Sequence, residues 1–567
     1  MDNKEKMSNA SQPINYMPHA GALNCYEFYM KATEQYGEYD AFQHLDYKGK
    51  RSEFLEDVNS LAYYFSEILH FKRNDVYTIF TPTNVESITM FYALNKIGVT
   101  INFVHPLLPT EVLLDTIEES GSKGVMIMDL LAKPHVKAIN ELNIPVIVCR
   151  NSDYASKIKQ PLTRAGEGMV TSLYPKFRNV TEYKKIVDKY RGKSVEGLKG
   201  NGEDIAVYLN GGGTTGKSKT IKLSSRAINE NVYSLGYIDH IEAPGEEGEI
   251  IILPFFHAFG LVVAMHMTMC NAARIIPMMQ FNAKRTVRLY KENRISGIIG
   301  IPNMFKKLYN TKGFDGPHLS NTRMMFVGGD DCSPAFINCF NEMLKKNGTG
   351  ARLRQGYGLT EVGSVCCANT NWVYKEGSVG KPLEGVRMAI WDENCKEVPN
   401  GEVGEICIAG PTIMSGYLTK DGKEDEGLYY DKEGTAWIRS GDLGYRDDDG
   451  FYYFSGRKKR LIIISGYNAY PVDIENLMDT LPFIQESCAV QGRTPEGKSM
   501  IRLYVSLKEK GDEKQYKETI IKTCEDNLSK FSVPRDIVFM DTLPHTPLEK
   551  VDFMKLTEDS LKLSNKN

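Results

Sequence analysis

Apolar and polar positions follow two different patterns along this chain, and the change falls near residue 400. Upstream, apolar runs with helical spacing, such as 85–94, alternate with short continuous apolar runs such as 125–128, 145–148 and 324–327. Continuous runs of this length are typical of strands buried on both faces, and their alternation with helices predicts mainly parallel sheets covered by helices. The sequence therefore predicts an α/β fold over about residues 25–410.

Downstream of residue 400, short strands bounded by glycines replace this pattern, as in 401–410 and 450–456. After Arg457 we expect a strand, a turn at Asn468-Ala-Tyr-Pro471, a helix from Val472, and then further strands and a helix. This order predicts a separate α+β domain of about a hundred residues. The expected division is a flexible N-terminal tail over 1–24, a large domain over 25–456, a hinge at 457–460 and a small domain over 461–567.

The length of 567 residues exceeds what one hydrophobic core usually organises, so at least two domains are expected. Hydrophobic residues make up 42% of the chain and charged residues 25%, which is ordinary for a globular protein. The net charge is −3 and the two signs are interspersed, so we expect no nucleic-acid groove and no polybasic membrane patch. Small molecules are the expected partners.

The N-terminal residues are polar and lack the apolar region of a secretory signal, and the 11 cysteines show no Cys-x-x-Cys pair and no zinc spacing. These features indicate reduced thiols in the core and a cytoplasmic location. The most apolar stretch, 250–279, is interrupted by His257, His266, Asn271 and Arg274, so it is too polar to span a membrane. We interpret it as buried core, which can also line a pocket, and expect no integral membrane segment.

Residues 208–219, Tyr-Leu-Asn-Gly-Gly-Gly-Thr-Thr-Gly-Lys-Ser-Lys, have the composition of a loop that holds phosphates. Glycines let backbone N–H groups close around an anion. Thr214 and Thr215 add hydroxyl donors, and Lys217 and Lys219 add positive charge. This segment predicts that the protein binds a nucleotide.

Two nucleotide chemistries compete for this loop, because Gly211–Ser218 also satisfies the Walker A pattern. A Walker loop opens directly into a helix, whereas residues 220–224 alternate apolar and polar side chains as a strand does. A strand also precedes the loop at 204–209, and the Walker-B-like run 124–129 lies upstream of it instead of downstream. We therefore predict the tip of a hairpin, with the first helix beginning after Ser224 or the next residue.

Several later segments accompany this loop. In sequence order, the set is 208–219, Leu253-Pro-Phe-Phe-His257, Val327-Gly-Gly-Asp-Asp331, Gln355-Gly-Tyr-Gly-Leu-Thr-Glu361, Gly404-Glu-Ile406, Ser440-Gly-Asp442, Gly456-Arg-Lys-Lys459, Ser465-Gly-Tyr-Asn-Ala-Tyr-Pro471 and Pro544-His-Thr-Pro-Leu-Glu-Lys550. Together, over nearly the whole chain, they resemble the adenylate-forming superfamily of acyl-CoA synthetases, luciferases and peptide-synthetase adenylation domains. The resemblance implies an α/β fold with a large N-terminal AMP-binding domain of mainly parallel β-sheets flanked by helices, a small β-barrel-like subdomain, and a small mobile α+β C-terminal domain.

In this superfamily a carboxylate attacks the α-phosphate of ATP, which gives an acyl-adenylate and pyrophosphate, and a thiol then displaces AMP. A carboxylate must approach a polyanion in the first step, so positioned cations and Mg²⁺ lower the barrier. By resemblance, the phosphates are held by Thr214, Thr215, Gly216 and Lys219.

The other nucleotide contacts that the resemblance implies lie in the later motifs. They are Thr360 at the α-phosphate, Glu361 on Mg²⁺, Tyr357 stacked on adenine, Gly329, Asp330 and Asp331 against its other face, Asp442 on both ribose hydroxyls, and Arg457 at the ribose or phosphate. A carboxylate suits a vicinal diol because it offers two acceptors in one plane.

Lys550 matches the family's catalytic C-terminal lysine, whose ammonium bridges the attacking carboxylate and the α-phosphate. Lys459 matches the hinge residue at which the small domain rotates after adenylation, withdrawing Lys550 and bringing Ser465-Gly466 to the thioester site. His257 matches a gate between the ATP and acyl pockets. The acyl-pocket positions are Phe256, Ala258, Phe259, Gly260 and Val262.

Taken singly, each of these residues has a plainer interpretation. The alternatives are a helix N-cap for Thr360-Glu361, a turn for Gly441-Asp442, solvated surface side chains for Lys459 and Lys550, and a core histidine for His257.

The chain also departs from the family pattern. Gly211-Gly212 replaces the usual serine pair, Ser218 the usual proline, and Thr220 the glycine after the lysine. Asp330-Asp331 replaces Ala-Pro beside adenine, where the carboxylates either accept a hydrogen bond from the amino group or face water. Glu549 replaces the glycine before Lys550, which leaves the approach angle of that lysine open. None of these changes removes a charge that the mechanism requires.

The expected activity is that of an ATP-dependent carboxylic acid–CoA ligase, with ATP, Mg²⁺ and CoA. Gly260 and the run 262–265 indicate an apolar pocket, so we expect a medium- or long-chain fatty acid, with an aromatic or sterol-type acid as the alternative. A second hypothesis is an adenylating enzyme that loads an acyl-carrier protein. A degenerate binding module is disfavoured, because Glu361, Asp442 and Lys550 are all retained.

Overall fold

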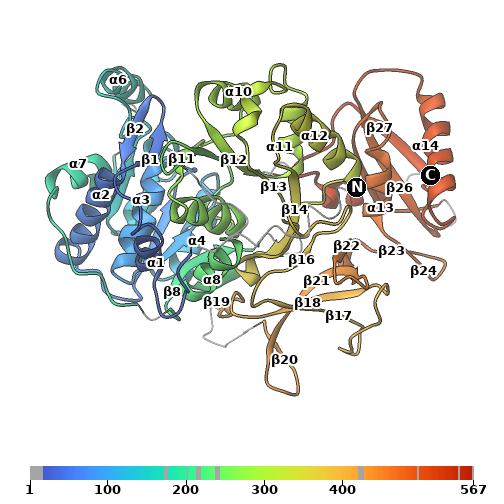
Figure 1. The fold of residues 1–567 in the computed structure, drawn as a ribbon, viewed down its shortest axis with the longest axis horizontal. Coiled ribbons are helices and arrows are strands. Elements are labelled where there is room, and N and C mark those ends of the chain that lie inside the picture. Colours follow the sequence, from blue (N-terminus) through green and yellow to red (C-terminus); the bar gives the residue numbers. More distant parts are fainter. Residues whose placement is uncertain are drawn as a thin grey trace, which may run out of the picture.

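The structure is a computed structural model that describes residues 17–171, 176–200, 202–211, 219–236, 243–418, 427–494, 497–546 and 550–564. Two large sheets organise the chain up to about residue 380, and smaller sheets follow (Figure 1). The α/β fold class predicted from the alternation of helices and strands is confirmed.

The first large sheet has eight strands in the order β19-β9-β8-β4-β3-β5-β6-β7. Pairing is parallel from β8 to β7, while β9 runs antiparallel to β8 and to β19. Its strands are β3 (Val76–Phe80), β4 (Thr100–Phe103), β5 (Ser122–Met128), β6 (Val146–Cys149), β7 (Val180–Glu182), β8 (Ile205–Asn210), β9 (Thr220–Ser224) and β19 (Tyr417–Leu418).

The second large sheet has nine strands in the order β16-β15-β14-β13-β12-β10-β11-β1-β2. Its parallel centre runs from β14 to β1, and antiparallel strands close both sides, β15 and β16 next to β14 and β2 next to β1. Its strands are β1 (Asp40–His44), β2 (Tyr47–Lys50), β10 (Gly248–Ile251), β11 (Arg274–Pro277), β12 (Ile295–Gly300), β13 (Met324–Val327), β14 (Leu353–Leu359), β15 (Ser364–Ala368) and β16 (Lys381–Pro382).

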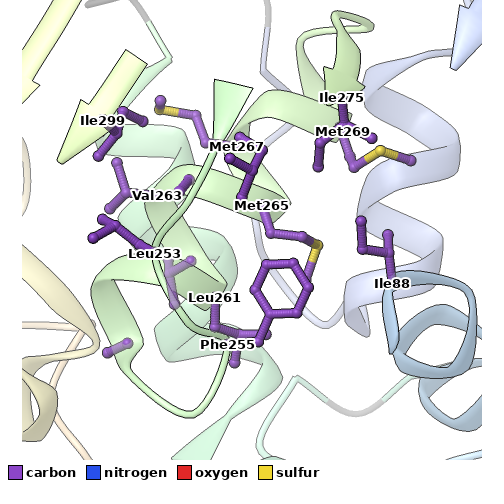
Figure 2. Packing of buried hydrophobic residues seen from close by; sticks show 14 of the residues in the cluster. Ile88, Leu253, Phe255, Leu261, Val263, Met265, Met267, Met269, Ile275 and Ile299 are labelled. Carbon is purple, nitrogen blue, oxygen red and sulfur yellow. The ribbon is translucent and has the colours of Figure 1, made fainter. Parts of the chain in front are cut away.

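Helices buried in the main core join the two large sheets. α8 (Ser225–Leu235) contacts both β9 of the first sheet and β15 of the second, and every residue of α3 (Val85–Lys96) is buried. The π-helix η3 (Phe259–Met267) packs on α8 and forms the middle of the apolar stretch 250–279, which was expected to form core. Figure 2 shows its side chains interlocked with those of neighbouring strands and of α3.

The remaining helices of this part lie mainly on the outer faces or between strands. They are α1 (Cys25–Ala32), α2 (Arg51–Tyr63), α4 (Thr110–Glu119), α5 (Val136–Leu142), α6 (Gln160–Thr171), α7 (Tyr183–Lys189), α9 (Thr268–Cys270), α10 (Ala283–Glu292), α11 (Pro302–Tyr309) and α12 (Pro334–Lys346).

Smaller sheets build the C-terminal third of the chain, drawn in gold to red in Figure 1. The small β subdomain pairs β17 (Arg387–Trp391), β18 (Gly404–Ala409), β20 (Tyr429–Tyr430), β21 (Ala436–Arg446) and β22 (Tyr452–Arg457) in antiparallel fashion. The last part comprises β23 (Ile462–Ile464), β24 (Tyr467–Ala469), α13 (Pro471–Met478), β25 (Ile484–Arg493), β26 (Ser499–Leu507), α14 (Glu513–Asn527), β27 (Asp536–Met540) and α15 (Phe553–Ser564). Its core cluster is separate from the main one.

One local prediction was wrong. The turn expected at Asn468-Ala-Tyr-Pro471 is occupied by β24 and the start of α13, and the chain reverses at Ser465 and Gly466 instead. Both residues have left-handed φ angles, 54° and 85°, which allow a two-residue reversal between β23 and β24. Pro471 is not a turn residue, because it occupies the first turn of α13, where its missing N–H costs no hydrogen bond.

The cysteines behave as expected, since all 11 are free and 9 of them are buried. Across the described ranges, no helix is long and apolar enough to cross a membrane.

Candidate active site

The predicted phosphate loop joins β8 to β9, and these strands pair as an antiparallel hairpin. Thr214, Thr215 and Gly216 lie outside the described residues, and Lys219 is the first described residue after the loop. The helix expected after the hairpin begins at Ser225, so the loop does not open directly into a helix and the Walker alternative is excluded.

Lys219 and Glu361 both contact the side chain of Tyr417. The ammonium of Lys219 lies 4.3 Å from the centre of the Tyr417 ring, and the Tyr417 hydroxyl donates to Glu361 Oε1 over 3.3 Å. Tyr417 belongs to β19, the edge strand that pairs with β9. The residue that the resemblance assigns to phosphate and the one it assigns to metal are therefore held side by side.

Glycines shape the turn that presents Thr360 and Glu361. A Cβ at Gly358 would lie 1.7 Å from the carbonyl oxygen of Ser364, because β14 and β15 approach closely there. Thr360 and Glu361 then form a single 3₁₀ turn, which ends at Gly363 with a φ of 76°. Only a residue without a Cβ accepts the contact at Gly358, which explains the second glycine of the Gln355–Glu361 motif.

Tyr357, Asp442 and Arg457 form a linked group. The Tyr357 hydroxyl donates to Asp442 Oδ2 over 2.8 Å, and Arg457 Nε lies 3.4 Å from Asp442 Oδ1. Burial raises the pKa of Asp442, while Arg457 and the Tyr357 hydrogen bond act in the opposite direction. The charges of Glu361 and Lys550 also act on Asp442, so the motifs converge in space.

The C-terminal lysine reaches this cluster from the last part of the chain. The ammonium of Lys550 donates a hydrogen bond to the carbonyl oxygen of Gly329, which follows β13. Lys550 is also close enough to His257 to lower the pKa of its imidazole. Residues 547–549, including Glu549, lie outside the described part of the chain.

His257 is half-buried beside Phe256, with their rings 4.7 Å apart. Burial, helped by the charges of Lys550 and His105, lowers the pKa of His257 from 6.5 to about 4. The imidazole is therefore neutral near pH 7. Its buried Nε2 atom has no hydrogen-bond partner among the described residues, so it is available to a bound group.

The residues expected to line the acyl pocket differ in burial and in what they contact. Ala258 and Val262 are buried in the main core, and Phe259 is half-buried against Phe326. Gly260 is required by the backbone, because a Cβ there would lie 2.1 Å from the carbonyl oxygen of Pro254. A larger residue at this position would therefore disturb the turn before it changed any pocket.

The paired aspartates after Gly329 have different surroundings. Asp330 is exposed, whereas Asp331 is half-buried and accepts a hydrogen bond from Gln355 Nε2 over 3.3 Å. Burial raises the pKa of Asp331 to about 6, against the opposing effect of hydrogen bonds from Asn476 and Gln355. Asn476 belongs to α13, so Asp331 joins the two parts of the chain as well as lying near the site.

A second contact between the parts lies nearby. Lys306 of α11 pairs with Asp479, which follows α13, over 2.8 Å. Lys459 lies in the 3₁₀ turn Lys458–Arg460 directly after β22, where it is exposed. Gly466 forms the reversal between β23 and β24 and is exposed as well.

The sequence interpretation missed His105 and Tyr417. His105 follows β4, and its ring lies 4.6 Å from that of Phe256. β4 pairs in parallel with β8, so His105 emerges at the same sheet edge as the phosphate loop. That edge rule could have identified His105, whereas nothing local in the sequence marks Tyr417.

Two family models match this chain. A family model described as "AMP-binding enzyme" matches residues 30–418, and one described as "AMP-binding enzyme C-terminal domain" matches residues 473–550. The long-chain-fatty-acid–CoA ligase of Escherichia coli O6:H1 is 24% identical over 550 residues, which cover 95% of each chain. The probable 4-coumarate–CoA ligase 3 of Dictyostelium discoideum is 27% identical over 479 residues, which cover 82% of this chain and 83% of the relative.

Among solved structures, the anthranilate CoA ligase AuaEII in complex with anthranoyl-AMP matches with a TM-score of 0.80. It is 18% identical in sequence, and the match covers 97% of this chain and 99% of that chain. This likeness concerns the fold.

Proposed function

Because the chain belongs to the AMP-binding enzyme family of adenylate-forming enzymes, we propose that it is an AMP-forming acid–CoA ligase acting on a medium- or long-chain fatty acid. In the first step, a carboxylate oxygen of the acid attacks the α-phosphorus of ATP, and the bond to pyrophosphate breaks. In the second, the thiol of CoA attacks the acyl carbonyl carbon and AMP leaves. The family membership confirms the resemblance that the motifs indicated.

The observation that carries this proposal is the contact of Lys550 with the Gly329 carbonyl, within electrostatic range of Asp442 and His257. An ammonium has three donors, and Gly329 takes one of them. The other two can serve the attacking carboxylate and the α-phosphate as negative charge builds. This is electrostatic stabilisation of a transition state by a fixed cation.

Asp442 is the proposed ribose ligand. Tyr357 and Arg457 hold the carboxylate in place, and a carboxylate has about four acceptor sites, so two remain for a vicinal diol. Tyr357 presents its ring against adenine, while Gly329, Asp330 and Asp331 border the other side. Arg457 serves the ribose or a phosphate.

Glu361 is the proposed ligand of Mg²⁺, and Thr360 that of the α-phosphate. Mg²⁺ usually binds through one or two carboxylates together with substrate phosphates and water, so one carboxylate beside the phosphate loop fits it. Within the described ranges, no three or more acidic, histidine or cysteine side chains form a separate metal site. When bound, the ion neutralises phosphate charge. Thr214, Thr215, Gly216 and Lys219 hold the phosphates in this proposal.

The acyl side is apolar in this proposal. His257 stays neutral because its pKa is about 4, so it can separate the acyl chain from the phosphates without adding a charge. Phe256, Ala258, Phe259 and Val262 supply the apolar surface, and Gly260 shapes the turn.

Rotation of the C-terminal part would follow adenylation. We assign the hinge to Lys459 and the thioester side to Gly466, and a rotation there would withdraw Lys550 from Gly329. The domain division at 457–460 and the cytoplasmic location remain predictions.

The identity of the acid rests on the relatives. Several are named long-chain-fatty-acid–CoA ligases, at 24% to 26% identity, which favours a fatty acid. A second candidate is an aromatic acid, because the relative with 27% identity is named a probable 4-coumarate–CoA ligase.

The test is ATP–pyrophosphate exchange across fatty acids of graded chain length, aromatic acids and sterol-type acids, followed by the same panel with CoA. We expect exchange and acyl-CoA formation with medium or long chains. Exchange without a CoA thioester, but with acyl transfer to a carrier-protein phosphopantetheine, would contradict the ligase assignment. A preference for aromatic acids would contradict only the fatty-acid assignment.

A further inference from the structure

The helix α6 has its polar side inward and its apolar side outward. Gln160, Thr163, Arg164, Glu167 and Thr171 are half-buried or buried, and they follow one face of the helix. The opposite face and the residues leading into it expose Ile158, Leu162 and Met169, with 86%, 78% and 78% of their surface accessible, and Val170 on the flank of the helix is 52% accessible. This arrangement is the reverse of an ordinary surface helix, whose apolar stripe faces the core.

Hydrogen bonds and ion pairs fix the helix in this orientation. Glu167 accepts a hydrogen bond from the Ser152 hydroxyl over 2.5 Å, and Arg164 pairs with Glu182 over 2.6 Å. The Gln160 side chain donates to the carbonyl oxygen of Ser152 over 3.2 Å. The helix therefore cannot rotate its apolar face inward without breaking these bonds.

The backbone on the outward side is uncovered by the described part of the chain, because a Cβ added at Gly166 or Gly168 would meet none of its atoms within 4 Å. In Figure 1, α6 stands at the outer margin of the N-terminal half, at the upper left and well away from the C-terminal part. Apolar side chains grouped in this way mark a surface that contacts another apolar phase or partner.

The charges around the apolar face are basic. Lys157 and Lys159 flank Ile158, and Lys176 and Arg178 follow the helix, all of them exposed. Over 156–171 and 176–179 the one acidic residue is Glu167, which is buried, although Asp46 from another loop pairs with Lys159 over 3.1 Å. The even balance of charge over the whole chain hides this local excess, so composition did not predict it.

The geometry points to α6 as a site at which the protein docks on an anionic lipid surface. Apolar side chains with basic neighbours suit the boundary between acyl chains and acidic headgroups. A symmetric contact with a second copy would bring the same basic residues of both copies together, which disfavours it. The proposal stands on the surface of α6 and does not require the proposed activity.

The experiment is co-sedimentation of the full chain with vesicles made of equal parts of phosphatidylcholine and phosphatidylglycerol, and with vesicles of phosphatidylcholine alone. We expect binding to the mixed vesicles that falls as salt is added, and weaker binding to the neutral ones. The double variant Ile158→Gln/Leu162→Gln should bind at least about tenfold less, because two apolar side chains no longer enter the interface.

Matched controls separate docking from general stickiness. Lys157→Glu should weaken binding to the mixed vesicles and leave binding to neutral vesicles unchanged. Ile463→Gln changes another exposed apolar residue, 56% accessible and far along the chain, and should leave vesicle binding unchanged. Because the α6 side chains are exposed, the unfolding midpoint of the double variant should equal that of the parent.

Three results would overturn the proposal. The first is no binding of the parent protein to either vesicle, and the second is equal binding by the parent and the double variant. The third is a solution mass of two chains that falls to one in the double variant, which would assign the face to a second copy.

Discussion

Two histidines at the two ends of one apolar segment have opposite surroundings. His266 is fully buried, with the Tyr92 hydroxyl 2.8 Å from Nδ1 and Asn229 Oδ1 3.1 Å from Nε2, so both ring nitrogens are satisfied. His257 is half-buried, and within the described part of the chain its buried Nε2 has no hydrogen-bond partner. Burial lowers the pKa of both, to about 3 and about 4.

The difference shows that a low pKa alone does not separate a structural histidine from a functional one. The separating features are the unsatisfied nitrogen of His257 and the nearby cation, Lys550, which adds to the effect of burial. For His266, burial is the only cause of the shift. We infer that the region around His257 is built to receive a ligand, whereas the region around His266 is built to stay closed.

The largest expected effect on activity comes from removing the positive charge of Lys550 beside His257. Lys550→Ala should lower ATP–pyrophosphate exchange about a thousandfold, or about 4 kcal/mol of transition-state stabilisation, because no other group replaces the ammonium. Stability should change little, since Lys550 is half-buried and donates a hydrogen bond to one carbonyl oxygen, that of Gly329.

Lys555→Ala provides the control, because Lys555 is an exposed lysine in α15. The Lys555→Ala substitution should leave ATP–pyrophosphate exchange unchanged. In Lys550→Ala, thioester formation from a preformed acyl-adenylate and CoA should survive. If this variant instead lost thioester formation and kept its exchange rate, Lys550 would not act in the adenylation step.

The same substitution at the two histidines should have opposite consequences. His266→Leu should lower the free energy of unfolding by about 3 kcal/mol, because it removes the partner of the buried Tyr92 hydroxyl and that of Asn229 Oδ1. His257→Leu should change stability by less than about 1 kcal/mol and alter acyl transfer instead.

Chemical denaturation and exchange kinetics, measured on both variants, test this pair. Equal losses of stability would show that His257 is a core histidine after all. Unchanged kinetics in a stable His257→Leu protein would contradict the assignment of His257 as a gate between the ATP and acyl pockets.

Acidification should act through His266 in a direction that its pKa fixes. Burial lowers that pKa from 6.5 to about 3, so the unfolded chain takes up the proton first as the pH falls. The stability that the neutral ring contributes is complete above pH 6.5 and is lost progressively toward pH 3. Between pH 7 and pH 5 the loss should be about 2 kcal/mol.

Buried carboxyls work against this trend, because burial raises the pKa of Asp57 and Asp129 to about 6 and that of Asp153 to about 7. The measurement is therefore the difference between parent and His266→Leu at each pH. That difference should shrink by about 2 kcal/mol on acidification, and a constant difference would contradict the assigned shift.

The sequence was more informative about His257, which lies in a motif, than about His266, which lies in the core. His257 was identified from Pro254-Phe-Phe-His257, whose neighbours carry family information, and the structure places it within electrostatic range of Lys550. His266 was noted only as an interruption of an apolar run. Its partners lie 174 and 37 residues away in sequence, and no local pattern shows that they meet.

The same limit applies to the fold. The strand β13 was predicted with its observed bounds because a short apolar run reports burial directly, and β9 was predicted with its observed bounds from its alternation of apolar and polar residues. The reversal at Ser465-Gly466 was missed, because proline at 471 was taken as a turn signal although it serves equally well in the first turn of a helix. The outward apolar face of α6 was missed, because periodicity shows that a helix has two faces but not which one points inward.

The smallest expected effect concerns a single hydroxyl. Tyr92→Phe keeps the buried ring against Phe54 and Tyr29 and removes the hydrogen bond to His266 Nδ1. The free energy of unfolding should fall by about 1 kcal/mol, and ATP–pyrophosphate exchange should stay unchanged. Tyr64→Phe is the control, since that hydroxyl meets Thr181 at 3.3 Å in a less buried place and should contribute less. A loss of exchange activity in a stable Tyr92→Phe protein would mean that the closed region around His266 communicates with the site, and the contrast between the two histidines would then be one of degree.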